Sequence, residues 1–169
     1  KVYVHNFIEL GIPPENIHII LGIVKNGDKP SEESLKLREL GVNVHHYQDD
    51  RSDKSYIPSI KPYLISKWLK EHPNYGKCFF LHDSDIIFRV LPDFKKLMND
   101  DITYLSDTIG YIGYDYIKTC CDRYEKQHPN SYEGQLIDEM TEVIGLEVEC
   151  VKCNQENSGG GQYLIKNTN

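Results

Sequence analysis

The fold prediction begins at the stretch Phe79-Phe80-Leu81-His82-Asp83-Ser84-Asp85-Ile86-Ile87-Phe88. Residues 78–81 form a continuous apolar run, which is typical of a strand covered on both faces rather than wetted on one. Two carboxylates at positions i and i+2, Asp83 and Asp85, follow this run immediately. Both can reach one cation if the strand bends there, and oxygen ligands of this kind suit Mg²⁺ or Mn²⁺. We therefore predict a buried strand that ends in a divalent-metal carboxylate pair.

Strand and helix patterns alternate along the rest of the chain. Strands are predicted at 16–22, 42–47, 78–81, 102–105, 146–151 and 162–165, and helices at 2–10, 31–40, 58–72, 92–99, 114–127 and 134–144. This order predicts one α/β domain over residues 1–169, a three-layer α/β/α sandwich with a mainly parallel, mixed central sheet. Ligands of such sheets bind beyond the carboxyl ends of the strands, which is where Asp83-Ser84-Asp85 falls.

Composition and charge exclude several classes of partner. The chain carries 19 Lys and Arg against 26 Asp and Glu, a formal net charge of −7, so we do not expect it to bind nucleic acid. No stretch approaches the roughly 20 apolar residues of a transmembrane helix. An odd number of cysteines favours a reducing compartment, so we expect a cytoplasmic protein, with a membrane-peripheral position as the alternative. Because the chain starts without Met and ends directly after an apolar run, we expect a piece of a longer protein.

The cysteines allow a second metal hypothesis. Cys150-Val151-Lys152-Cys153 has the spacing of a zinc knuckle, and Cys120-Cys121 could supply the other two thiolates. Adjacent residues on a helix point about 100° apart, so both rarely serve one tetrahedral centre. Buried thiols are therefore the favoured interpretation.

The carboxylate pair has a specific chemical use. A cation held there neutralises a diphosphate and acts as a Lewis acid on the charge that develops on a departing nucleoside diphosphate. An Asp-x-Asp triplet is by itself common in solvated loops and helix caps, and its position after an apolar strand is what favours metal binding here. For His82 we favour a hydrogen bond to the backbone over metal ligation, because adjacent strand residues point to opposite faces.

Two further segments could contribute to a site. Asn157-Ser158-Gly159-Gly160-Gly161-Gln162 leads into an apolar strand, and its three glycines would let a ligand approach the backbone closely; the alternative is a flexible hairpin. Ser106-Asp107-Thr108 ends another predicted strand, where Asp107 could orient substrate hydroxyls. A helix-capping role for Asp107 is the equal alternative.

These segments together resemble the GT-A glycosyltransferases, particularly the glycogenin-like and lipopolysaccharide galactosyl- or glucosyltransferase-like retaining enzymes. The resemblance lies in motif order: an apolar strand ending in Asp-x-Asp, here 79–88, and later an Asn-[Ala/Ser]-Gly stretch running into a strand that ends in Asn, here 157–167. Residues 59–68 also look like the helix before the metal strand. The likeness covers the chain from about Tyr56 onward, and it implies that the fold's first strand and C-terminal part lie outside this chain.

The resemblance implies a role for each matching position. It makes Asp83 and Asp85 metal ligands, with Asp83 also at the donor ribose. The donor-sugar and acceptor side would be lined by Asn157, Gly159, Gly160, Gly161 and Gln162, and Lys67 or Lys61 would contact the donor. We assign Gln162 to catalysis on this basis, and Asp107 on the basis of its place at a strand end. Three departures stand against it. Lysine replaces the family's usual Arg, Asn154-Gln155 replaces its Asp-Gln pair, and the histidine that completes the family's metal site would follow Asn169.

The predicted activity is therefore a metal-dependent transfer of a hexose from a nucleoside diphosphate sugar to a hydroxyl of a glycan or lipid-linked acceptor. A UDP-sugar donor and retention of configuration are implied by the resemblance alone. One alternative is a phosphatase of the aspartyl-phosphate type, in which the first Asp is the nucleophile. That type prefers Thr or Val where this chain has Ile87, and it carries a later Gly-Asp-x-x-x-Asp that this chain lacks. The other alternative is a non-catalytic carbohydrate-binding relative.

Overall fold

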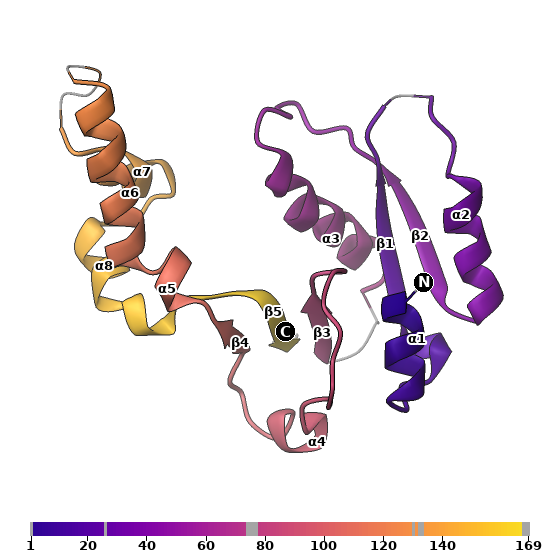
Figure 1. Cartoon of the computed structure of the whole chain (residues 1–169). Helices are drawn as coiled ribbons and strands as arrows, with labels where there is room; N and C mark the ends of the chain where they lie inside the picture. The colour runs from indigo at the N-terminus through magenta and orange to yellow at the C-terminus, as the bar shows by residue number, and fades with distance from the viewer. Residues whose placement is uncertain (1, 26, 74–77, 130, 132–133, 167–169) are drawn as a thin grey trace. The chain divides into compact units, whose positions relative to one another are not determined.

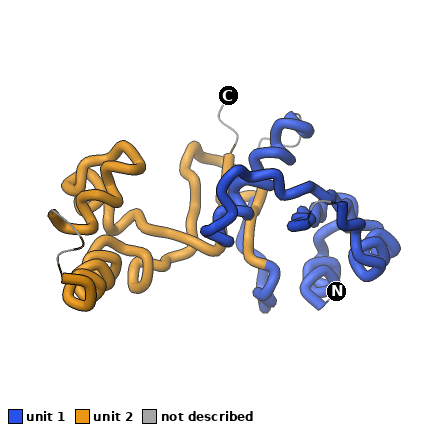
Figure 2. The backbone as a smooth tube through the Cα atoms, turned by 90° about the horizontal axis from the view of Figure 1, so that it is seen from above, with its two compact units in different colours: residues 1–77, 84–94 blue, residues 78–83, 95–169 orange. Residues whose placement is uncertain are grey.

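The computed structural model describes residues 2–25, 27–73, 78–129, 131 and 134–166 (Figure 1). Asn167, the last residue of the predicted glycine motif, lies outside these ranges. The chain divides into two compact units. Unit 1 comprises residues 1–77 and 84–94, and unit 2 comprises residues 78–83 and 95–169, coloured blue and orange in Figure 2.

Unit 1 is built on a parallel pair of strands. Its elements are α1 (Val2–Glu9), β1 (His18–Ile23), α2 (Glu32–Lys36), β2 (Asn43–Gln48) and α3 (Ile60–Glu71), with short 3₁₀ turns at Pro14–Asn16, Leu37–Leu40 and Ile57–Ser59. His18 lies opposite Asn43 and Ile23 opposite Gln48, so both carboxyl ends lie at the same edge. The strands predicted at 16–22 and 42–47 and the three predicted helices are confirmed.

Local sequence signals set the ends of the second helix. The Ser31 hydroxyl accepts a hydrogen bond from the Ser34 N–H at 3.2 Å, which satisfies one of the unpaired donors of the first turn. Gly41 ends the following 3₁₀ turn with φ 78°, a left-handed conformation that favours glycine. Both the predicted start and the predicted stop are therefore confirmed.

One hydrophobic cluster of unit 1 lies between α3 and the parallel pair. Tyr47, Leu64 and Trp68 are buried there, and Ile20, Ile60, Tyr63 and Leu69 pack against them. Gly22 explains how closely α3 approaches β1, because a Cβ at Gly22 would lie only 2.9 Å from the Cδ1 atoms of Ile60 and Leu64. The absence of a side chain there brings helix and strand together.

The residues that follow the Asp pair return to α1. The Asn6 amide donates to the Phe88 carbonyl at 3.0 Å and accepts from the Phe88 N–H at 2.9 Å. The rings of Phe7 and Phe88 meet edge to face, with centroids 5.3 Å apart. These contacts attach residues 84–94 to unit 1.

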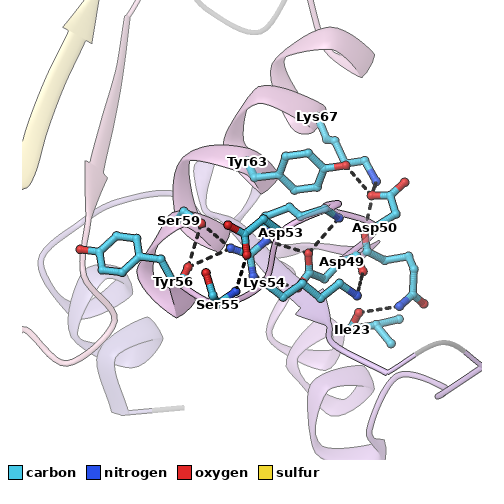
Figure 3. A network of polar contacts seen from close by, with 12 residues as sticks. Ile23, Asp49, Asp50, Asp53, Lys54, Ser55, Tyr56, Ser59, Tyr63 and Lys67 are labelled. Atoms are coloured by element: carbon cyan, nitrogen blue, oxygen red, sulfur yellow. Dashed lines mark hydrogen bonds and ion pairs between the residues drawn. The ribbon is translucent and has the colours of Figure 1, made fainter. Parts of the chain in front are cut away.

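A polar network follows the carboxyl end of β2 (Figure 3). Asp49 is completely buried, and Arg51 donates to both of its carboxylate oxygens, from Nε at 2.9 Å and from Nη2 at 3.0 Å. Hydrogen bonding by Arg51 lowers the pKa of Asp49. Arg51 also donates to the Tyr56 carbonyl at 3.1 Å and to the Ser59 hydroxyl, so the buried pair ties the end of β2 to the start of α3.

A second polar cluster of unit 1 consists of three histidines, His18, His45 and His72, which pack beside Trp68. His18 Nδ1 lies 3.0 Å from His45 Nε2, and the rings are stacked with centroids 5.3 Å apart. His72 meets His45 edge to face at 4.9 Å and stacks on Trp68. Burial first, and the neighbouring imidazoles second, lower the pKa of His18 to about 4. The fold of unit 1 therefore favours the neutral form of His18.

Unit 2 combines an antiparallel sheet with a group of helices. Its elements are β3 (Cys78–His82), β4 (Tyr104–Asp107), α5 (Ile109–Ile112), α6 (Tyr114–Gln127), α7 (Leu136–Val143), α8 (Val148–Cys153), a 3₁₀ turn at Gln155–Asn157 and β5 (Gly159–Lys166), while α4 (Phe94–Leu97) starts at the boundary between the units. The strand order is β3-β5-β4, with both pairings antiparallel. Helix α6 has the predicted bounds, and α7 lies within its predicted range.

Two sequence predictions fail in unit 2. The strand predicted at 146–151 is wrong, because α8 occupies this region. Leu146 and Val148 alternate like a strand, but Val148 and Val151, three residues apart, are the half-buried positions, which is helical spacing. The side chains of β3, an edge strand of the described sheet, are half-buried, not covered on both faces as predicted.

The α/β class is confirmed. The described strands form a parallel pair, β1-β2, and an antiparallel trio, β3-β5-β4. The prediction of one domain over residues 1–169 stays a prediction. In the described ranges, no helix is both long and apolar enough to cross a bilayer.

Asp49→Asn should destabilise unit 1, because it leaves the Arg51 guanidinium, whose side chain is 9% exposed, without its counter-charge. The matched control is Asp50→Asn, since the Asp50 side chain is 57% exposed. Trp68, the one tryptophan of the chain, reports unfolding of unit 1 by fluorescence in urea. We expect a lower urea midpoint for Asp49→Asn than for Asp50→Asn; equal midpoints would contradict a structural role for the buried pair.

Unit 1 should lose stability as the pH falls. The pKa of His18 drops from 6.5 to about 4 on folding, so the unfolded chain binds the proton more readily between these values. Stability is therefore complete above about pH 6.5 and declines toward pH 4, by about 1–2 kcal/mol once partial solvent exposure is allowed for. Urea unfolding followed by Trp68 fluorescence at pH 7.5 and 5 measures the loss. His18→Asn should reduce this pH dependence, and an unchanged dependence would refute the assignment to His18.

Candidate functional site

Three strand ends meet at the glycine segment of unit 2 (Figure 1). On one side of β5, His82 lies opposite Gln162, and the Asp83 N–H donates to the Gly161 carbonyl at 3.2 Å. On the other side, Asp107 lies opposite Gly159. Because β3 and β4 run in the same direction on the two sides of β5, their carboxyl ends both reach its amino end. The structure thus brings together, from the predicted site residues, Asp83, Asp107, Gly159, Gly160, Gly161 and Gln162.

The glycine segment forms a β-bulge. Leu105 lies opposite Tyr163, and Asp107 lies opposite Gly159. An advance of two residues along β4 therefore corresponds to four residues along β5. Gly161 has φ 76°, and the Ser106 hydroxyl donates to the Gly160 carbonyl beside it. Bulges of this kind bend a strand, re-aim side chains and are common next to active sites. The segment is part of a strand, so the alternative of a flexible hairpin is wrong.

Two of the glycines are required for different physical reasons. A Cβ at Gly159 would lie 2.3 Å from the Leu105 Cβ, so only glycine allows this approach of β5 to β4. A Cβ at Gly161 would lie 3.4 Å from Asp83 Oδ2 and 3.9 Å from Ser106 Oγ. The Asp83 carboxylate and the Ser106 hydroxyl therefore both lie beside the bare backbone of Gly161.

Ser106 is a site residue that the sequence reasoning did not select. Along β4 the exposed residues are Leu105 and Asp107, and Ser106 alternates with them on the more buried side. This alternation is a property of the fold, because the apolar Leu105 lies on the exposed side and the polar Ser106 on the more buried side. What the sequence does not show is that Ser106 faces a bulge in a strand more than 50 residues away.

Asp107 performs the capping role that was the alternative prediction. Its Oδ1 accepts a hydrogen bond from the Ile109 N–H at 3.1 Å, at the start of α5. The side chain is exposed, whereas the next residue, Thr108, is 6% exposed. A carboxylate that is exposed at a strand end can hold a helix start and still meet a substrate hydroxyl.

The two predicted metal ligands are placed differently. Asp83 is half-buried in unit 2, and Asp85 is exposed in a turn that belongs to unit 1. Among the residues the structure describes, no group of three or more His, Cys, Asp and Glu side chains is arranged to hold a metal. Each of Asp83 and Asp85 is a carboxylate, the ligand type by which Mg²⁺ is usually held together with substrate phosphates and water.

His82 behaves as predicted. Its Nδ1 lies 2.8 Å from the Asp83 carbonyl, and its ring stacks on Phe80 with centroids 5.4 Å apart. The nitrogen facing a carbonyl must carry the proton, so it donates to the backbone. The hydrogen bond to the backbone is confirmed.

The predicted lysines lie in unit 1, whereas the glycine strand belongs to unit 2. Lys67 donates to Asp50 Oδ1 at 2.5 Å and to the Gln48 carbonyl at 3.1 Å, and the bond to Asp50 raises its pKa (Figure 3). Lys61 is half-buried on α3. Any donor contact through Lys67 requires its release from Asp50.

Residues just before the glycine strand are linked to the helices of unit 2. Asn157 is exposed and ends the 3₁₀ turn, where its N–H donates to the Asn154 carbonyl at 2.9 Å. Gln155 accepts from the Asp115 N–H at 2.8 Å and donates to Asp115 Oδ2 at 3.0 Å, which fixes the turn to the start of α6. An open cavity of about 410 Å³ borders this link. Its lining residues are Ile109, Gly110, Asp115, Tyr116, Thr119 and Gln155.

The cysteines are less buried than predicted. Cys121 is buried, Cys78 and Cys120 are half-buried, and Cys150 and Cys153 are exposed. The prediction of buried thiols is therefore right for Cys121 and wrong for the pair on α8. Within the described part of the chain, these thiols belong to no group of three or more side chains arranged to hold a zinc ion.

Comparison of this chain with protein-family models, with curated proteins and with solved structures gives no match. The chemistry of the site is therefore argued from its own residues. A half-buried carboxylate, a hydroxyl and bare glycine backbone lie together, and this arrangement can bind a polyhydroxylated or phosphorylated ligand through a cation and hydrogen bonds.

Replacing the glycines of the bulge should destabilise unit 2. Gly159→Ala forces a methyl group into β4 and should cost about 1–3 kcal/mol, the usual range for overpacking. Gly161→Ala should cost about 1–2 kcal/mol, because alanine is strained at positive φ. Gly134→Ala is the matched control, since nothing lies within 4 Å of a Cβ at that position. Urea unfolding followed by circular dichroism, with hydrogen exchange of the β5 amides, measures these losses; equal effects at 134 and 159 would contradict the packing argument.

Proposed function

We propose that this chain is the catalytic part of a metal-dependent glycosyltransferase. It moves a hexose from a nucleoside diphosphate sugar, a UDP-sugar, to a hydroxyl of a glycan or lipid-linked acceptor, with retention of configuration. One observation carries the proposal: the Asp83 carboxylate lies beside the bulged glycine backbone at Gly161, with Asp107 at the other edge of β5. The order of these motifs along the chain, which resembles that of the GT-A enzymes, supports it.

Asp83 and Asp85 are the residues that would hold Mn²⁺ or Mg²⁺. When bound, the ion supplies Lewis acidity that neutralises the diphosphate as it departs. The glycines carry no Cβ that would hold a ligand away from this segment, while the Gly160 and Gly161 carbonyls already accept hydrogen bonds from the Ser106 hydroxyl and the Asp83 N–H. Gln162, within β5, and Asp107, opposite Gly159 on β4, are assigned to orient the donor sugar and the acceptor hydroxyl. The positive φ of Gly161 and the Ser106 hydrogen bond hold this backbone in place before a ligand arrives.

The proposal includes the finer fold. We assign the chain to a GT-A-like three-layer α/β/α domain with a mixed central sheet. A parallel pair and an antiparallel trio are both compatible with such a sheet. The segment that leaves β3 at Asp83 and reaches the α1 contact at Phe88 carries the metal ligands of the proposal.

Asp83→Asn should weaken metal-dependent nucleotide binding. The substitution keeps the shape of the side chain but removes the charge that a divalent cation requires. Calorimetry of the full chain with Mn²⁺ and a panel of UDP- and GDP-sugars should show binding to at least one donor, weakened by about tenfold or more in Asp83→Asn, equivalent to about 1.4 kcal/mol. Asp101→Asn, an exposed aspartate elsewhere in unit 2, removes the same charge and should bind like the parent.

The outcomes separate the proposal from its alternatives. If no nucleotide sugar binds with or without metal, the glycosyltransferase assignment is wrong. Hydrolysis of a phosphomonoester that is lost in Asp83→Asn would instead indicate the aspartyl-phosphate type of phosphatase. Binding of a free saccharide, unaffected by metal and nucleotide, would indicate a carbohydrate-binding protein.

A further inference from the structure

Two of the five cysteines are open to reagents, and both lie on α8. Cys150 and Cys153 are exposed, whereas the other three thiols are buried or half-buried. Burial raises the pKa of the Cys78 and Cys121 thiols, which keeps them protonated and poorly nucleophilic. We therefore expect thiol reagents to react first with Cys150 and Cys153, the pair on α8.

The spacing of the pair suits a disulfide. Residues i and i+3 of an α-helix have Cα atoms about 5 Å apart, within the roughly 4.4–6.8 Å that disulfides span. Their Cβ atoms, about 5–6 Å apart in a regular helix, must approach to about 3.5–4.5 Å, so the bridge requires the turn between them to tighten. Cys153 is the last residue of α8. The Asn154 N–H that follows is shared between the carbonyls of Cys150, at 3.3 Å, and Val151, at 3.2 Å. This last turn is thus partly 3₁₀, a geometry in which side chains at i and i+3 eclipse and come closer together.

Only weak contacts hold the two sulfur atoms in their present positions. Cys153 Sγ lies 3.7 Å from Glu149 Oε1, and Cys150 Sγ lies 4.0 Å from the Asn154 amide nitrogen. Thiols are weak hydrogen-bond donors and acceptors, so a rotation of either side chain costs little. Both sulfur atoms can therefore turn toward each other without breaking a strong interaction.

We propose that Cys150 and Cys153 form a reversible disulfide and that α8 carries a redox modification site. With a small disulfide such as oxidised glutathione as the oxidant, one cysteine thiolate attacks a glutathione sulfur and releases one glutathione thiolate. The second cysteine thiolate then attacks the protein sulfur of the mixed disulfide and releases the second glutathione. The two thiols lose two protons and two electrons in total, and one oxidised glutathione becomes two reduced molecules. The proposal is independent of the glycosyltransferase assignment.

The position of the pair gives the bridge a structural consequence. Helix α8 leads through the 3₁₀ turn Gln155–Asn157 directly into β5. The Gln155 side chain fixes this turn to Asp115. A disulfide at the end of α8 therefore restrains the chain just before the glycine bulge.

The test is a redox titration of the full chain with oxidised glutathione, followed by acid quenching and peptide mass spectrometry. The parent should form a Cys150–Cys153 link, so that the thiols titratable after denaturation fall from five to three and return to five with dithiothreitol. Cys150→Ser and Cys153→Ser lack the second thiol, so each should accumulate a glutathione adduct on its remaining α8 cysteine. Cys120→Ser is the control and should react like the parent.

Several results would overturn the proposal. Stable glutathione adducts on both α8 cysteines of the parent would show that the second thiol does not displace glutathione. A link from either cysteine to Cys120, or covalent dimers of the chain, would show that the pair is not intramolecular. An unchanged count of five thiols would show that the site does not react.

Discussion

The close approach of two backbones at Gly159 is the constraint on which the rest of unit 2 depends. Both β3 and β4 bond to β5, so β5 is the central strand of this sheet. A single Cβ at Gly159 would lie 2.3 Å from that of Leu105 and would push β4 away. The bulge that follows needs a left-handed residue at Gly161. Glycine at these two positions lets three strand ends meet, and the Asp83 carboxylate lies at that junction.

Unit 1 uses polar residues differently. Its buried Asp49 is satisfied by Arg51, a bidentate pair that fixes the loop after β2 and leaves no charge available for a ligand. In unit 2, the Asp107 carboxylate remains exposed while one of its oxygens caps α5. The first arrangement stabilises a loop, whereas the second leaves an acidic group at an accessible strand end. The accessible acidic group of the candidate site therefore lies at the glycine strand of unit 2.

Much of the candidate site was predictable from local patterns. Three local patterns each predicted the end of a strand: the apolar run before Asp83, the polar residues at Asp107 and the glycines before Gln162. The structure brings these three segments together. Ser106 was missed because its partner, the carbonyl of Gly160, is distant in sequence. The prediction of a strand at 146–151 was wrong because a short apolar segment fits both the two-residue period of a strand and the 3.6-residue period of a helix. The half-buried positions, Val148 and Val151, have the helical spacing.

The sequence by itself determined where most elements begin and end, because caps, glycines and hydrophobic periods act over a few residues: Ser31 and Gly41 bound one helix, and α6 has its predicted bounds. It also determined the chemistry available, from the carboxylates at Asp83 and Asp85 to the bare backbone at 159–161. Only the tertiary structure decided that β5 pairs antiparallel between β3 and β4 and that its bulge faces Ser106. Strand pairing depends on contacts between residues far apart in the chain, and no local pattern specifies them.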